Sequence, residues 1–78
     1  MKATLFSSNG VQSEIELSSF SHAQKLVDGL VEIIYLKSNY LLINEEGLIS
    51  NLPPNPFFPN LNGNILLVNK TDFDLLPF

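Results

Sequence analysis

The segment from Asn44 to Asn64 places four prolines between two apolar runs, and it constrains the fold more than any other part of the chain. The four prolines are Pro53, Pro54, Pro56 and Pro59. Because proline fixes φ and lacks a backbone N–H, neither a helix nor a central strand can cross the segment. Connections this long without regular structure are uncommon in compact domains and are usually functional or disordered. Disordered segments are poor in large apolar residues, so we predict an ordered surface loop that packs its own side chains. The apolar residues are Leu48, Ile49, Leu52, Phe57, Phe58 and Leu61.

The chain lacks the covalent and metal links that often stabilise small domains. Its 78 residues suffice for a single domain, residues 1–78, with one modest core. There is no cysteine for a disulfide, and a single histidine argues against a structural zinc site. We expect neither a metal nor a cofactor. Oligomerisation is the remaining common source of stability, so we expect a homo-oligomer, most simply a dimer.

The charge of the chain argues against nucleic acid as a partner. The net charge is -4, with four lysines and no arginine, whereas nucleic-acid affinity rests on cationic contacts to phosphates. No apolar run approaches the length of a membrane span, and no basic region followed by an apolar one marks a secretion signal. We therefore expect a cytoplasmic protein without membrane contacts.

Alternating polar and apolar residues predict an N-terminal hairpin. Residues Lys2 to Ser7 and Val11 to Leu17 alternate on either side of the turn sequence Ser8-Asn9-Gly10. Residues 30–36 and 40–44 predict a second hairpin, and 65–68 a last strand that is central because it is apolar throughout. Strands apolar on both faces must be covered on both sides or lie at an interface.

Residues 18–29 have helical spacing. Ser21 and Gln24 fit a capping box at the start of this helix, and Gly29 fits the left-handed position that ends it. Thr71, with Asp74 three residues later, predicts one final capped turn. The fold class is therefore α+β: a small, mostly antiparallel sheet in the order β-β-α-β-β-loop-β, with one helix packed on one face.

The titratable residues do not form a recognisable catalytic pattern. His22 is the only histidine and has no nucleophile pattern near it, so we expect no chemical role for it. Glu45 and Glu46 are adjacent and, if extended, point to opposite faces, which prevents them from acting as a paired acid and base. We predict no catalytic and no metal-binding residues.

The loop offers a candidate surface for a partner. The prolines present a rigid surface suited to a partner's groove, or simply stiffen the loop. Of two adjacent phenylalanines, one is expected to enter the core while the other stays exposed as an anchor. The asparagines of this region more often satisfy turn backbone than bind a ligand. The predicted partner-binding residues are Glu45, Glu46, Leu52, Pro53, Pro54, Asn55, Phe57 and Phe58.

Three sequence elements in the second half of the chain resemble a known family. They are the Asn44-Glu45-Glu46-Gly47 turn, the element Leu52-Pro53-Pro54-Asn55 and the glycine-led last strand from Gly63 to Val68. This combination is similar to a family of small domains of unknown function carried mainly by bacteriophages and plasmids. The family carries over no chemistry, but the resemblance implies an accessory protein of a mobile element. Pro56 departs from it, because a basic residue often follows the asparagine there.

We therefore expect a non-enzymatic protein, present in the cytoplasm of a host cell, that binds and inhibits or modulates a host protein through residues 45–61. One alternative is an oligomer that sequesters a small molecule such as a nucleotide-like signal, although few lysines are available to hold a phosphate. A lesser alternative is a small enzyme with Glu45 or Glu46 as its base.

Overall fold

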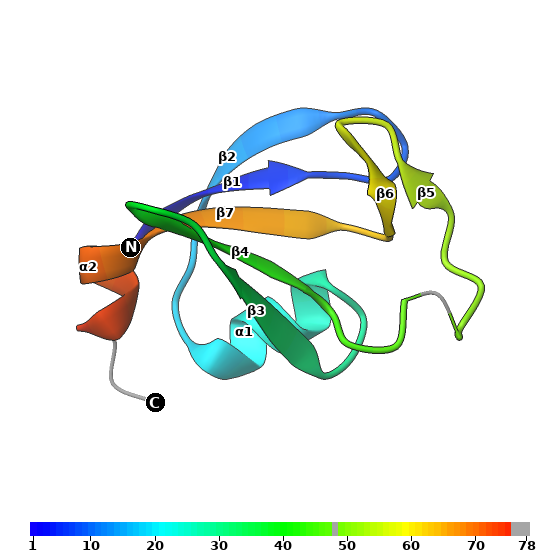
Figure 1. Ribbon diagram of the computed structural model, residues 1–78. Coiled ribbons are helices and arrows are strands. Elements are labelled where there is room, and N and C mark those ends of the chain that lie inside the picture. The colour runs from blue at the N-terminus through cyan, green and yellow to red at the C-terminus, as the bar shows by residue number, and fades with distance from the viewer. Residues whose placement is uncertain (48, 76–78) are drawn as a thin grey trace.

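The main element of the fold is a five-stranded sheet in the order β2-β1-β7-β4-β3, in which every neighbouring pair is antiparallel (Figure 1). The computed structural model describes residues 1–47 and 49–75. The sheet strands are β1 (Lys2–Phe6), β2 (Gln12–Glu16), β3 (Val31–Tyr35), β4 (Asn39–Asn44) and β7 (Ile65–Asn69). The remaining elements are the helices α1 (Phe20–Leu26) and α2 (Lys70–Asp74) and a separate two-stranded hairpin of β5 (Pro54–Asn55) and β6 (Phe58–Asn62).

Both predicted hairpins and the central last strand are present. β1 pairs with β2 across the predicted turn, and β3 pairs with β4. β7 lies between β1 and β4, where an apolar strand is covered on both faces. In β2, Ser13 and Ile15 are half-buried while Gln12, Glu14 and Glu16 are exposed, as the alternation predicts.

The larger core lies between the sheet and α1. Ala23 of α1 and Val27, the C-cap of this helix, are fully buried with Leu42 of β4 and Leu66 of β7. A seven-residue helix is too short to be stable alone, so this packing must hold it in place. Its N-cap is Ser19, whose Oγ accepts from the backbone N–H of His22 at 3.0 Å. The predicted capping box at Ser21 and Gln24 is therefore wrong by two positions.

The end of α1 also differs from the prediction by one residue. Asp28, with φ 64°, takes the left-handed position that was predicted for Gly29. The Asp28 and Gly29 N–H groups donate to the carbonyls of Lys25 and Gln24, which is a Schellman motif. Gly29 is needed for a different reason: a Cβ there would lie 2.8 Å from Nδ2 of Asn44.

The second face of the sheet carries a smaller core beneath the β5–β6 hairpin. Leu41, Ile43 and Ile65 are buried there without a second chain, so the hairpin provides much of the cover for which a dimer was predicted. The dimer itself stays a prediction. The sequence predicted a loop without regular structure across the proline-rich segment. This prediction is wrong, because part of the segment forms the β5–β6 hairpin. The pairing is short and shifts register between Pro54 and Asn55, which accommodates the missing donors.

A second helix, α2, corrects the expectation of a single one. Asn69 caps it, accepting from the N–H of Asp72 at 3.1 Å, so the predicted cap at Thr71 is wrong. Tyr40 donates its hydroxyl to Asp74 Oδ1 at 3.0 Å and so ties α2 to β4. Burial, and then the neighbouring Asp74 carboxylate, raise the pKa of the Tyr40 phenol above its ordinary value. None of the described helices is long and apolar enough to cross a membrane.

Candidate functional site

The loop between β4 and β7 is held in place by asparagine side chains, beginning with Asn44 at the end of β4. Its Nδ2 donates to the carbonyl of Val27 at 2.9 Å, and its Oδ1 accepts from the N–H of Glu46 at 2.7 Å. Asn44 is buried. The side chain therefore links the acidic turn to the end of α1, two segments far apart in sequence.

Asn55 is the central support of the β5–β6 hairpin. Its Nδ2 donates to the carbonyls of Phe6 at 2.8 Å and Gly63 at 2.9 Å, and its Oδ1 accepts from the N–H of Phe57 at 2.9 Å. The residue has no exposed surface. Its prediction as a partner-binding residue therefore needs correction: the side chain is fully engaged inside the chain and holds the hairpin against β1.

Two further asparagines complete the framework. Asn62 donates to the carbonyl of Leu52 at 2.7 Å. Asn64 donates to the carbonyl of Leu26 at 3.0 Å and accepts from the N–H of Ser8 at 2.9 Å. The interpretation of these asparagines as partners of turn backbone is thus confirmed for Asn55, Asn62 and Asn64.

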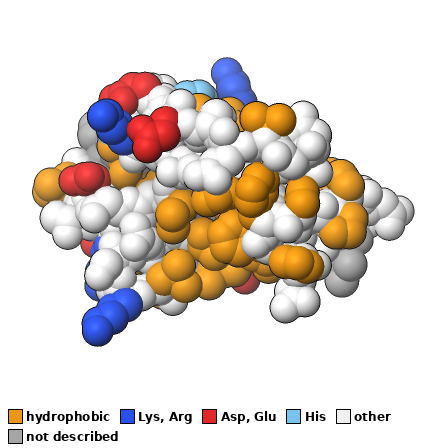
Figure 2. All heavy atoms as spheres, turned by 90° about the horizontal axis from the view of Figure 1, so that it is seen from above, with side chains coloured by type: hydrophobic (Ala, Val, Ile, Leu, Met, Phe, Trp, Pro, Cys, Tyr) orange, Lys and Arg blue, Asp and Glu red, His pale blue; other side chains and the backbone are white. Residues whose placement is uncertain are grey.

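The adjacent phenylalanines divide their roles as expected. Phe58 is half-buried and packs on the second core, whereas Phe57 remains exposed. Both rings contact Phe6 of β1, with centroid distances of 5.2 Å for Phe58 and 5.1 Å for Phe57. Seen from above, hydrophobic side chains gather in a broad apolar surface (Figure 2). Leu52 is half-buried, which is less than the packing expected for it.

The side chains of several loop residues make no hydrogen bond or ion pair within the part of the chain that the structure describes. Glu45, Glu46, Pro53 and Pro54 are all exposed. Among the described residues the one ion pair joins the N-terminal amine to Glu16, so neither acid of the turn has a cationic partner there. Ile49 is 80% exposed, which contradicts the prediction that it packs within the loop. Leu48 lies outside the described residues.

A small pocket lies where the acidic turn meets β6. It has a volume of about 180 Å³, and the residues that line it include the acids Glu32 and Glu45 and the apolar residues Ile43 and Leu61. The other lining residues are Asn44, Gly47, Asn60 and Asn62. Glu46 does not line it, consistent with adjacent side chains pointing apart.

Sequence reasoning missed Glu32 as a site residue. It lies on β3, the edge strand, and reaches the loop only through the pairing of Glu32 with Ile43 of β4. A single charge within a β-prone run was the available signal, since such a residue marks the open face of its strand. Its approach to Glu45 required knowledge of the register.

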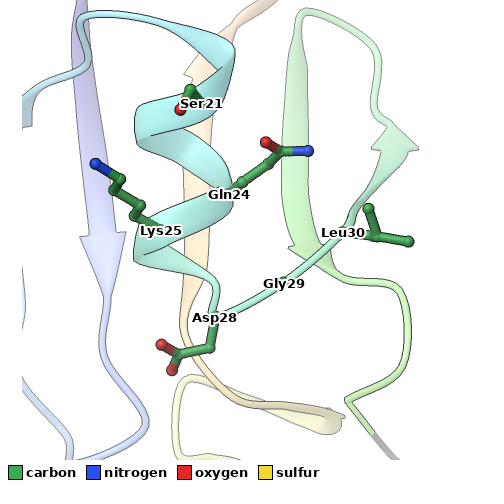
Figure 3. A pocket seen from close by; sticks show the side chains of 6 residues that line it. All are labelled: Ser21, Gln24, Lys25, Asp28, Gly29 and Leu30. Carbon is green, nitrogen blue, oxygen red and sulfur yellow. The ribbon is translucent and has the colours of Figure 1, made fainter.

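A second hollow, beside α1, lacks convergent groups. Ser21, Gln24, Lys25, Asp28, Gly29 and Leu30 line it. Figure 3 shows that Lys25 and Asp28 point to one side of the helix while Gln24 and Leu30 point to the other. His22 lies in the first turn of α1, where its Nδ1 accepts from the N–H of Ser18 at 3.2 Å and lies 3.3 Å from the Ser18 hydroxyl oxygen.

No three Asp, Glu or His side chains among the described residues are grouped as metal ligands. No curated protein and no solved structure matches this chain. The family profile described as "Domain of unknown function (DUF3846)" matches residues 1–77 and thus nearly the whole chain, including every element of the site. The chain belongs to the DUF3846 family of domains of unknown function.

Proposed function

We propose that this protein is a non-enzymatic binding module that recognises a partner protein with the exposed part of the loop from Glu45 to Leu61. The observation that carries this proposal is the combination of two unpaired acids and exposed apolar side chains on a rigidly held loop. In its full form, the proposal is an accessory protein of a phage or plasmid that acts in the host cytoplasm and inhibits or modulates a host protein.

The rigidity of the loop supports the proposal. Asn44 and Asn55 fix it to the ends of α1 and β1, and the prolines restrict its backbone. A surface that is already ordered loses little conformational entropy when it binds, so more of its contact energy appears as affinity. Ile49 and Phe57 then provide apolar anchors of the kind that dominate protein interfaces.

The charges of the loop indicate the chemistry of the partner. Glu45 and Glu32 line one pocket together with the apolar residues Ile43 and Leu61, a setting that fits the alkyl stem and cationic head of a lysine or arginine. Glu46 is exposed beside it and adds a second negative charge to the turn. We therefore propose a basic segment with apolar neighbours as the feature recognised on the partner.

The two alternatives have less support. Pockets for drug-sized small molecules usually have volumes of roughly 300 Å³ or more, which exceeds the volume of about 180 Å³ of the pocket beside the acidic turn. The hollow beside α1 is larger, about 670 Å³, but the side chains that line it do not converge on one point (Figure 3). The carboxylates of the acids that line the smaller pocket also oppose the phosphate of a nucleotide-like signal. For an enzyme with a glutamate base, neither Glu45 nor Glu46 has a positioned partner among the described residues.

Affinity purification from candidate host cells, followed by mass spectrometry of proteins and extracted small molecules, tests the proposal. The bait pair is the wild type and the Glu45→Ala/Glu46→Ala double variant. The double variant should fold normally, because exposed charges contribute little to stability. Its affinity for a captured protein should fall by about 1 to 3 kcal/mol if one acid forms a hydrogen-bonded charge contact.

Glu14→Ala/Glu16→Ala is the matched control, since it removes the same charge from the opposite edge of the sheet. This control and His22→Ala should leave partner affinity unchanged. Equal binding by the loop variant and the control would contradict the site, and co-purification of a stoichiometric small molecule without a protein would favour the sequestering alternative.

A further inference from the structure

The edge strand β3 has a backbone that is free to form hydrogen bonds. It is the last strand of the sheet and pairs only with β4 (Figure 1). The N–H of Leu36 donates to Asn39 at 2.9 Å, and the carbonyl of Leu30 accepts from Glu45 at 2.8 Å. Hydrogen-bonded positions alternate along an antiparallel pair, so the backbone N–H and C=O groups of the even-numbered residues of β3 point toward β4. The odd-numbered residues, Val31, Ile33 and Tyr35, therefore direct their N–H and C=O groups outward.

The same edge exposes large apolar side chains. Leu30 is 58% exposed, Tyr35 72% and Leu36 46%, and these three lie at the two ends of one short segment. Among the described residues no hydrogen bond outside the sheet engages the backbone of Val31, Ile33 or Tyr35. An edge that is both unpaired and apolar is a template for another strand.

We propose that β3 pairs antiparallel with β3 of a second copy of this chain, about a two-fold axis through Ile33. Outward-facing residues must then lie opposite one another, and this register pairs Ile33 with itself and Val31 with Tyr35. Each such pair exchanges two hydrogen bonds, so all three outward residues are satisfied. A shift by one residue would place outward residues opposite inward ones, and a shift by two would place Tyr35 or Val31 opposite a residue outside β3.

The register also makes the apolar side chains self-complementary. Residues whose numbers add to 66 lie opposite each other, so Leu30 of each copy faces Leu36 of its partner. Glu32 faces Ile34, which keeps the two like charges off directly opposing positions. The interface is isologous, as a closed two-fold dimer requires.

The opposite edge of the sheet does not offer the same surface. In β2, the outward groups belong to Gln12, Glu14 and Glu16, because the N–H of Leu17 and the N–H of Ser7 donate within the hairpin at the odd positions. Self-pairing about Glu14 would place two carboxylates opposite each other, which is destabilising. The second copy is therefore assigned to β3 and not to β2.

The dimer would complete the pocket described above. Glu32 lines the pocket and is also a member of the edge strand. In the proposed register it lies beside Ile34 of the partner copy, which adds an apolar side chain to the surroundings of the acid. The inference is independent of the identity of any partner protein.

Sedimentation equilibrium across micromolar concentrations tests the pairing, beginning with the wild type. It should show reversible association from 8.7 kDa to twice that mass. Tyr35→Pro removes an outward N–H from an exposed position and leaves the bonds to β4 intact. It should weaken the dimer by roughly tenfold or more, because two hydrogen bonds are lost per dimer. Glu14→Pro makes the matched change on β2 and should leave association unaltered.

Opposite charges introduced at Leu30 and Leu36 test the register, and this test does not require β3 to tolerate a proline. Leu30→Lys and Leu36→Glu should each weaken the dimer, whereas the double variant should restore it, since each lysine would face a glutamate across the axis. Circular dichroism confirms that each variant is folded. A strict monomer at high concentration, a dimer insensitive to both Tyr35→Pro and the single charges, or a double variant no better than the singles would overturn the proposal.

Discussion

Replacing Asn55 should destabilise this protein more than any other polar substitution in the loop. The side chain makes three hydrogen bonds and has no exposed surface. At about 1 kcal/mol net for each bond, Asn55→Ala should cost about 3 kcal/mol. A chain of 78 residues has a total stability of about 4 to 12 kcal/mol at the usual ~0.05 to 0.15 kcal/mol per residue. The loss is therefore a large fraction of the whole.

Urea unfolding followed by circular dichroism measures this loss. With an m value of about 1 kcal/mol/M, the midpoint should fall by about 3 M at an unchanged slope. Hydrogen exchange gives a local readout, because the N–H of Phe57 donates to Asn55 Oδ1 and should exchange faster in the variant. Asn55→Asp tests the Oδ1 and Nδ2 hydrogen bonds separately, because it keeps the Oδ1 acceptor but loses both Nδ2 donors. It also buries a charge, so it should be at least as destabilising as Asn55→Ala at neutral pH.

Asn60→Ala is the control for Asn55→Ala. Asn60 is an exposed asparagine of the same hairpin, and its substitution should change stability by less than about 0.5 kcal/mol. If Asn55→Ala cost no more than Asn60→Ala, the hairpin would be held by its apolar contacts and the reasoning from the buried amide would fail.

Three further substitutions test the turn after α1 and the link to α2. Asp28→Gly should stabilise the chain by about 0.5 to 1 kcal/mol in chemical denaturation, because it relieves a left-handed φ, whereas Gly29→Ala should destabilise it by crowding Asn44. Tyr40→Phe should lower stability at neutral pH and make its decline at alkaline pH shallower. The Tyr40 pKa is raised in the folded state, so this stabilisation is complete below the ordinary tyrosine pKa and is lost as the pH rises through the folded value. Tyr35→Phe, at an exposed tyrosine, is the control, and equal alkaline profiles for the two variants would contradict the assignment.

The strands were predictable because their side-chain pattern directly reflects burial. Alternation predicted that β2 has one solvent-facing side, and apolar residues of both parities predicted that β4 and β7 are covered on both sides. Both patterns can be read from neighbouring residues alone, without knowledge of the tertiary structure.

The predictions for the two ends of α1 were wrong because neighbouring residues suit each end equally well by local sequence. Contacts in the folded structure decide between them. Ser18, Ser19 and Ser21 all suit an N-cap, and Ser19 is the one that leaves Phe20 packed against the core. Gly29 suits the left-handed position by propensity, but Asp28 takes that position, and the glycine instead leaves room for the side chain of Asn44. Neither contact is visible in a local window of sequence.

The β5–β6 hairpin was missed for a related reason. Prolines remove the backbone donors that normally define a strand, and side-chain amides take over part of the work: Asn55 reaches β1, and Asn62 reaches Leu52. Asparagine in a proline-rich segment signals a turn by propensity, so its use as a long-range support is recognised only from the fold.

The division of labour within the loop gives the functional proposal its strongest physical basis. Asn44 and Asn55 are buried and bonded on both sides of their amides, so changes at these positions act through stability. Glu45 and Glu46 lie between them in sequence but are exposed and unpaired among the described residues, so their removal should leave these contacts intact. A loop that needed only to cover the second face of the sheet would gain nothing from two adjacent carboxylates and an exposed Ile49. Binding and stability should therefore respond to different residues of the same segment.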